Sequence, residues 1–284
     1  MNAKLSAYIA LTRIDRPVGI YLVLWPALWA LWFASEGLPE LHLLVVFIFG
    51  AILMRSAGCV INDYADRNFD GHVERTCNRP LATGALSAKQ ALTFFVILCL
   101  IAFGLVLTLN SFTVWLSIGA LVLATLYPFM KRYTYWPQAF LGAAFAWAIP
   151  MAFAAVQNAL PNALWLIFIA TLVWSLIYDT AYAVTDKKDD LKVGIKSTAI
   201  LFGDKLLYWM AFFKVMMLSL LVMTGSAFEM GKIYYIGLAI VAFWFAYDLK
   251  RLAMNDEQVA FKVFIQNHWI GLVILFGIIL DYAL

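Results

Sequence analysis

The chain has 284 residues, of which 64% are hydrophobic and 13% are charged, and its formal net charge is +3. Soluble domains carry roughly 25% charged residues, so this composition excludes an ordinary water-soluble fold. We therefore expect the lipid bilayer to surround the chain, and we expect no nucleic-acid partner.

Apolar runs recur along almost the whole sequence, each near the length of about 20 residues that a helix needs to cross a bilayer. They predict an all-α, polytopic membrane protein with a single membrane-embedded domain over residues 1–284. The segment 2–14, ahead of these runs, suits either a helix at the lipid headgroups or a cytosolic tail. Only Asn110 and Ser111 separate the third and fourth runs. About nine spans are predicted, over 17–35, 40–62, 92–110, 112–130, 137–156, 162–182, 205–226, 231–251 and 265–283.

The end of the second predicted helix carries the first of two acidic segments, Asn62–Asp70. At 100° per residue, Asn62, Asp66 and Asp70 share one side of a helix, and Asp63 falls between the last two. The same stripe extends backwards to Arg55, about two turns into the apolar part of the helix. This spacing predicts one continuous polar stripe.

The second acidic segment ends the sixth predicted helix. Its polar residues stand at positions i, i+3, i+7 and i+11, which also share one helix face. They are Asp179, Tyr182, Asp186 and Asp190.

Carboxylates this close together repel one another, and burying each of them near lipid costs about 2.5 kcal/mol or more. The pattern therefore predicts a bound cation, and hard oxygen ligands suit Mg²⁺, which also accepts phosphate oxygens. Basic residues follow each segment, so acid, metal and base together indicate a diphosphate site; solvated helix ends are the plainer alternative. The expected metal ligands are Asp63, Asp66, Asp70, Asp186 and Asp190, and the expected basic partners are Arg75, Arg79, Lys187 and Lys196.

Polar residues also repeat with an offset of 120 residues. This offset predicts two parallel repeats, at about 40–156 and 162–283, with the first span as an addition. The two acidic segments would then face each other across a central axis. The matched pairs are Asp66 with Asp186, Asp70 with Asp190, and Tyr127 with Tyr247, and each tyrosine precedes a Lys-Arg pair.

Lysines and arginines are concentrated in the N-terminal segment and in the loops after the even-numbered spans. The positive-inside rule then places these segments in the cytoplasm and the C-terminus outside. For a bacterial chain the expected location is the inner membrane.

The acidic segments resemble those of the UbiA superfamily of intramembrane prenyltransferases, above all its 4-hydroxybenzoate polyprenyltransferases. The motif Asn-Asp-x-x-Asp-x-x-x-Asp matches at 62–70 and Asp-x-x-x-Asp at 186–190, and Tyr-x-x-x-Lys matches at Tyr127 and Lys131. Typical of the hydroxybenzoate branch are the opening Arg-Ile-Asp-Arg-Pro-Val-Gly at 13–19, Leu-Trp-Pro at 24–26, Asp-Gly-His at 70–72 and Gly-Ile-Lys-Ser-Thr at 194–198. The resemblance covers nearly the whole chain.

The resemblance implies nine transmembrane helices around a central cavity, Mg²⁺ bound by both acidic motifs, and a polyprenyl diphosphate donor. It also implies 4-hydroxybenzoate as acceptor, alkylated at the carbon ortho to its hydroxyl in ubiquinone biosynthesis. The acceptor carboxylate needs a cation, for which Arg55 and Arg132 are the first candidates and Arg16 the third. Tyr127 and Tyr182 are candidate site residues, and Asp186, Asp190 or the departing diphosphate is the candidate proton acceptor.

Two other functions remain compatible with the sequence. The same chemistry on naphthoate or homogentisate would need no change in the acidic motifs. A transporter would also explain paired repeats and central carboxylates, but it predicts interrupted helices at corresponding places, whereas these acids lie at helix ends.

Overall fold

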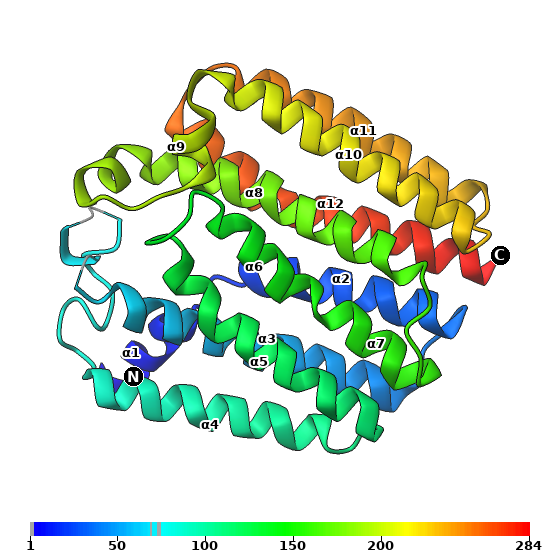
Figure 1. Ribbon diagram of the computed structural model, residues 1–284, viewed down its shortest axis with the longest axis horizontal. Coiled ribbons are helices and arrows are strands. Elements are labelled where there is room, and N and C mark those ends of the chain that lie inside the picture. The colour runs from blue at the N-terminus through cyan, green and yellow to red at the C-terminus, as the bar shows by residue number, and fades with distance from the viewer. Residues whose placement is uncertain (1–2, 69, 73–74) are drawn as a thin grey trace.

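The computed structural model describes residues 3–68, 70–72 and 75–284, and within these ranges it contains helices and no strand. The prediction of an all-α membrane protein is confirmed, since nine helical segments of the described chain are long and apolar enough to cross a bilayer. Figure 1 shows them as an array of long helices with the C-terminus at one end and the N-terminus at the other. The elements are α1 (Ala3–Thr12), α2 (Val18–Ser35), α3 (Leu41–Asp66), η1 (Asp70–His72), α4 (Ala88–Val106), α5 (Ser111–Met130), α6 (Pro137–Ala146), α7 (Ala148–Gln157), α8 (Leu164–Val193), α9 (Thr198–Phe202), η2 (Gly203–Lys205), α10 (Leu206–Ala227), α11 (Lys232–Leu252) and α12 (Glu257–Ala283).

The boundary between the third and fourth spans has a local cause. The Asn110 side chain caps α5 by accepting a hydrogen bond from the Thr113 amide at 2.9 Å. Its amide group also donates to the Ala154 carbonyl at the end of α7, at 2.6 Å. Asn110 therefore marks the start of α5 and links it to α7 by a hydrogen bond.

The fifth span is interrupted at Trp147, which divides it into α6 and α7. Pro150 has no backbone N–H, so the Ala146 carbonyl lacks its usual helical partner there. The Trp147 indole donates to the Leu116 carbonyl at 2.8 Å and lies against Gly119 of α5, where a Cβ atom would come within 2.6 Å of the ring. The break is thus held by α5.

The centre of the array is formed by α2, α8 and α12. Trp29 and Trp174 are both fully buried, with ring centroids 5.3 Å apart. Gly271 of α12 allows this approach, because a Cβ atom at that position would lie 2.5 Å from the Trp174 ring. The outer helices α4 and α5 instead expose apolar side chains such as Leu100 and Trp115, as lipid contact requires.

The first helix, α1, packs against α3 rather than standing apart. Leu11 is fully buried, and the Tyr8 ring meets that of Phe94 in α4 with centroids 4.8 Å apart. Arg13, directly after α1, adopts a left-handed φ of 54°, which turns the chain toward α2. This packing brings a positive charge to the end of α3.

Candidate active site

A cavity of about 660 Å³ lies where the ends of α3 and α8 meet α2, α5, α6 and α12. Most residues predicted for the site line it. Those in the lining are Arg16, Arg55, Asn62, Asp66, Asp70, Arg75, Arg79, Tyr127, Lys131, Tyr182, Asp186, Asp190 and Lys196. Asp63, Arg132 and Lys187 do not belong to the lining.

The first acidic segment is not one continuous helical stripe, which corrects the prediction. The helix α3 ends at Asp66, and Asp70 begins the separate short helix η1. Lys131 of the Tyr-x-x-x-Lys motif forms an ion pair with Asp66, and the Arg79 guanidinium binds both carboxylate oxygens of Asp70 at 2.9 Å. Burial raises the pKa of Asp70 above its ordinary value, with the Arg79 charge opposing this effect.

Asp63 lies behind the cavity wall. It follows Asn62 by one residue and therefore points about 100° away from it, toward α1. The Oδ1 atom of Asp63 accepts a hydrogen bond from Arg13 at 2.5 Å and lies 3.2 Å from Nη1 of Arg79. Asp63 therefore binds two arginines through Oδ1, while its Oδ2 atom is buried without a hydrogen-bond partner, and its role as a metal ligand stays a prediction.

The second acidic segment keeps its predicted geometry, because α8 continues as a helix to Val193. Asp179, Tyr182, Asp186 and Asp190 all line the cavity. The Nε atom of Arg75 donates to Asp186 at 2.8 Å, and the Arg75 guanidinium lies 4.6 Å from the centre of the Tyr182 ring. Through Arg75, the loop that follows the first acidic segment thus contacts the second acidic segment.

Each acidic motif is balanced by bases, and the donor set suits a hard cation. Asp66 is 3% exposed and its Oδ1 atom is buried without a hydrogen-bond partner, which leaves a carboxylate oxygen open to a ligand. In the described ranges, no three acidic, His or Cys side chains converge closely enough to surround a metal by themselves. Mg²⁺ commonly takes one or two carboxylates and fills its other positions with water and phosphate oxygens, so Asp66, Asp70, Asp186 and Asp190 fit it.

Arg55 lies deeper in the cavity than the acidic motifs. Its Nε atom is buried without a hydrogen-bond partner, and its guanidinium lies 5.7 Å from the centre of the Phe145 ring. Asp179 of α8 lines the same cavity as Arg55. Gly19 of α2 leaves room for Arg55, since a Cβ atom there would meet its Nε atom at 2.4 Å.

Three other cationic residues of the predicted site form no ion pair with the two acidic motifs among the described residues. Arg132 donates to the Ala65 carbonyl near the end of α3 and lies outside the cavity lining, so Arg55 is the better placed of the two candidates for the acceptor carboxylate. Lys187 precedes the exposed Lys188 on α8, outside the cavity lining. Lys196 lines the cavity, and its Nζ atom donates to the Tyr133 carbonyl at 3.2 Å.

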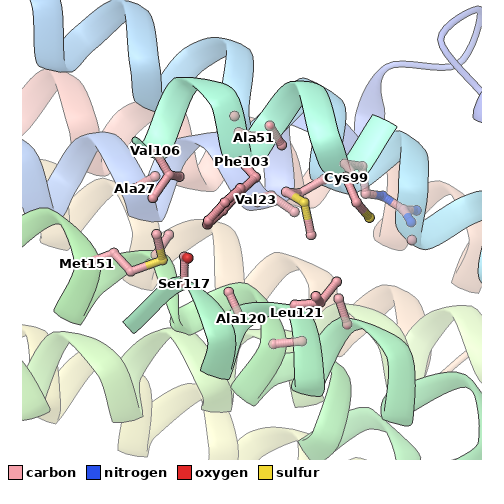
Figure 2. A pocket seen from close by; sticks show the side chains of 18 of the residues that line it. Val23, Ala27, Ala51, Cys99, Phe103, Val106, Ser117, Ala120, Leu121 and Met151 are labelled. Atoms are coloured by element: carbon pink, nitrogen blue, oxygen red, sulfur yellow. The ribbon is translucent and has the colours of Figure 1, made fainter. Parts of the chain in front are cut away.

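A second cavity, of about 550 Å³ and almost wholly apolar, adjoins the first. Figure 2 shows it between α4, which carries Cys99 and Phe103, and α5, which carries Ser117, Ala120 and Leu121. The two cavities share Arg55, Tyr127 and Phe145 in their linings. An apolar groove therefore leads away from the polar site at the level of Arg55.

Several residues of the cavity were absent from the predicted site. Gln138 and Tyr178 line it and belong to no motif that could have identified them, whereas Ser197 also lines it and belongs to the Gly-Ile-Lys-Ser-Thr motif at 194–198. Arg13 begins the motif Arg-Ile-Asp-Arg-Pro-Val-Gly at 13–19, and Asp179 is a charge inside a predicted span. Two signals point to Asp179: intramembrane charges commonly face a protein interior, and helical spacing places it on the same face as Tyr182 and Asp186.

Comparison with known families gives a match over residues 23–271 to the UbiA prenyltransferase family. Among curated relatives, a 4-hydroxybenzoate octaprenyltransferase of Hydrogenovibrio crunogenus is 63% identical over 278 residues, which are 98% of each chain. One of Pseudomonas aeruginosa is 54% identical over 277 residues, covering 98% of this chain and 94% of the relative.

Solved structures share the fold at lower sequence identity. A UbiA homolog from Aeropyrum pernix K1 matches with a TM-score of 0.81 and 24% identity, over 93% of this chain and 97% of that one. A UbiA homolog from Archaeoglobus fulgidus, bound to GPP and Mg²⁺, matches with a TM-score of 0.73 and 17% identity, over 96% of this chain and 99% of that one. At these identities the likeness concerns the fold.

Proposed function

The chain belongs to the UbiA prenyltransferase family, and from this premise we propose that it transfers a polyprenyl group from a polyprenyl diphosphate to 4-hydroxybenzoate, at the ring carbon ortho to the hydroxyl. This reaction is a step of ubiquinone biosynthesis. The observation that carries the proposal is one polar cavity, lined by two acidic motifs and their bases, that continues into an apolar groove. A diphosphate with a long isoprenoid tail needs both.

The diphosphate would lie between the ends of α3 and α8. Asp66, Asp70, Asp186 and Asp190 would hold Mg²⁺, which supplies positive charge to stabilise the departing diphosphate. Because a diphosphate is itself anionic, the bases now paired with these acids can turn to its oxygens. Arg75, Arg79 and Lys131 are placed for this exchange.

The isoprenoid tail would follow the apolar groove between α3, α4 and α5. The groove begins at Arg55 and Tyr127, beside the polar cavity, and its walls are almost entirely hydrocarbon. Phe103 and Leu121 line it and are themselves 42% and 41% exposed at the outer surface of the helix array. The groove therefore reaches the face that we expect to contact lipid, and a long tail can extend there.

The acceptor carboxylate would bind Arg55. A guanidinium offers paired N–H donors that match a carboxylate, and the Nε–H of Arg55 has no other partner. The position of Arg55 between the polar cavity and the groove would bring the acceptor ring beside the first carbon of the tail.

The reaction follows from the allylic character of the donor. The C–O bond to diphosphate breaks and its electron pair leaves with the diphosphate, which the cavity cations stabilise. The electron-rich ring carbon then forms the new C–C bond, and the ring loses one proton to a cavity carboxylate or to the diphosphate. Tyr127 and Tyr182 line the cavity, and their rings would shield the allylic cation.

We further propose that the protein lies in the bacterial inner membrane with the acidic loops in the cytoplasm. The loops that follow α3 and α8 lie at the same end of the array as the N-terminus, on the left in Figure 1. Together with the N-terminal segment and the adjoining helix ends, these loops carry most of the lysines and arginines. Labelling of single cysteines introduced at Asn255 and Gly37 from either side of sealed membranes would test the orientation.

The function can be tested by transfer of a radiolabelled prenyl group to 4-hydroxybenzoate in membranes that contain the protein, with Mg²⁺ and with EDTA. We expect a prenylated product that depends on the metal. Product with naphthoate or homogentisate in place of 4-hydroxybenzoate would contradict the acceptor but not the chemistry. Absence of product with all three acceptors would contradict the chemistry and favour a transporter.

A further inference from the structure

A second polar cluster is buried in the other half of the molecule, among α10, α11 and α12. Lys214 and Asp248 are 2% and 0% exposed, and their Nζ and Oδ2 atoms lie 3.7 Å apart. Arg251 Nη1 lies 3.7 Å from Oδ1 of Asp248 and donates to Oε1 of Gln266 at 2.5 Å. These four side chains belong to the lining of neither cavity described above.

Charges are costly to bury in a membrane protein, and they commonly mark function. Lys214 also lies 4.1 Å from the centre of the Phe245 ring, but its Nζ atom and both Asp248 oxygens have no hydrogen-bond partner. Well-packed apolar side chains often replace such a pair without loss of stability. Stability alone is therefore a weak reason for the cluster.

The cluster reaches the active site through α12. Gln266 directly follows Phe264 and Ile265, both of which line the polar cavity, and successive helical residues point about 100° apart. The hydrogen bond from Arg251 thus holds α12 from behind while its neighbours form the cavity wall. The Phe264 ring centroid lies 4.7 Å from that of Tyr182. The Tyr182 ring in turn contacts the Arg75 guanidinium, which binds Asp186.

The offset of 120 residues supports a specialised role for Arg251. At this offset Arg251 corresponds to Lys131, because each stands four residues after a tyrosine, Tyr247 and Tyr127. Lys131 lines the cavity and pairs with Asp66, whereas Arg251 points to α12. At the first of these positions, Lys131 binds the first acidic motif directly. At the second, Arg251 binds α12, which forms the cavity wall beside the second motif.

We infer that Lys214, Asp248, Arg251 and Gln266 form a positioning cluster, which sets α12 so that Phe264 and Tyr182 hold Arg75 and Asp186 in place for the diphosphate. The inference rests on the proposed function, since it assigns the diphosphate to that end of the cavity. The four residues act through α12 and touch no substrate.

The test compares Gln266→Leu with Gln266→Glu in the purified full-length protein. The leucine removes the acceptor of the Arg251 hydrogen bond, whereas the glutamate keeps it. The matched control is Gln258→Leu, at an exposed position of the same helix. The measured quantities are KM for the polyprenyl diphosphate, KM for the acceptor, the thermal midpoint, and the Kd of an unreactive thiolo analogue of geranyl diphosphate with Mg²⁺.

We expect Gln266→Leu to raise the diphosphate KM and the analogue Kd about tenfold, with acceptor KM, thermal midpoint and both other variants close to wild type. A lower thermal midpoint with unchanged KM and Kd would overturn the inference and leave a purely structural cluster. If Gln266→Leu does not fold, Lys214→Met/Asp248→Leu, which removes both buried charges together, must show the same rise in Kd. Because analogue binding requires no turnover, it separates this inference from the proposed reaction.

Discussion

The outer helices are arranged differently in the two halves of the molecule, of which one is formed by α3–α7 and the other by α8–α12. In the first half, α4 and α5 stand apart and leave the apolar groove between them and α3. In the second half, α10 and α11 are joined by the buried pair of Lys214 and Asp248. Yet α3 and α8 both bring aspartates to the same cavity.

This difference would let the two predicted repeats contribute differently to one site. The inner helices of both halves supply charge for one anionic group, so both keep acids and bases. Only one tail has to be accommodated, so one pair of outer helices can open while the other closes. We interpret the halves as repeats of about 40–156 and 162–283 that kept the polar site and diverged around it.

The largest expected effect is the loss of either acidic motif. Asp66→Ala and Asp186→Ala should each lower prenyl transfer at least about a hundredfold, because each removes a carboxylate that would hold the Mg²⁺ that stabilises the departing diphosphate. Removal of the metal with EDTA should have a similar effect. Initial rates at saturating donor would measure all three, with Asp189→Asn on α8 as the control. Unchanged activity in Asp186→Ala alone would break the equivalence of the two halves.

A smaller effect is expected at the boundary between cavity and groove. Arg55→Leu should raise the acceptor KM roughly tenfold to a hundredfold, since a hydrogen-bonded charge partner is lost. The donor KM should stay within about twofold, and Arg55→Lys should lie between, because an ammonium cannot bind a carboxylate through paired donors. A rise in the donor KM instead would assign Arg55 to the diphosphate.

The groove itself can be tested with donors of different length. Ala120→Phe adds a ring to the groove wall and should raise the KM of a long-tailed donor about tenfold, as overpacking does in a filled site. A five-carbon donor should be affected little. Ala239→Phe, at an exposed position of α11, is the matched substitution in the other half. Equal effects of the two substitutions on the long donor would argue against a tail in the first half.

The smallest effect is expected for Lys187, which was predicted to bind substrate. Because it lies outside the cavity lining, Lys187→Ala should change the kcat and both KM values by less than about twofold. Lys131→Ala, measured beside it, should reduce transfer strongly, since Lys131 pairs with Asp66 inside the cavity. A large loss in Lys187→Ala would show that the last turns of α8 move over the bound diphosphate.

By itself, the sequence determined the spans and the polar face of the second acidic segment. A chain in lipid must satisfy its backbone polar groups internally, so each apolar run of about 20 residues becomes a helix. Helical spacing then places Asp179, Tyr182, Asp186 and Asp190 together without any tertiary information. Asn110 likewise signals a helix start between two spans.

Only the tertiary structure decided which charges meet. Arg13 pairs with Asp63 and Arg75 with Asp186, across 50 and 111 residues of chain. Arg132 donates to the Ala65 carbonyl near a helix end, while the Arg55 side chain keeps an unpartnered donor. Local periodicity specifies the direction of a side chain from its own helix, but the partner of a long, flexible cation depends on which helices pack beside it. For the same reason, the groove between α4 and α5 could not be read from their composition.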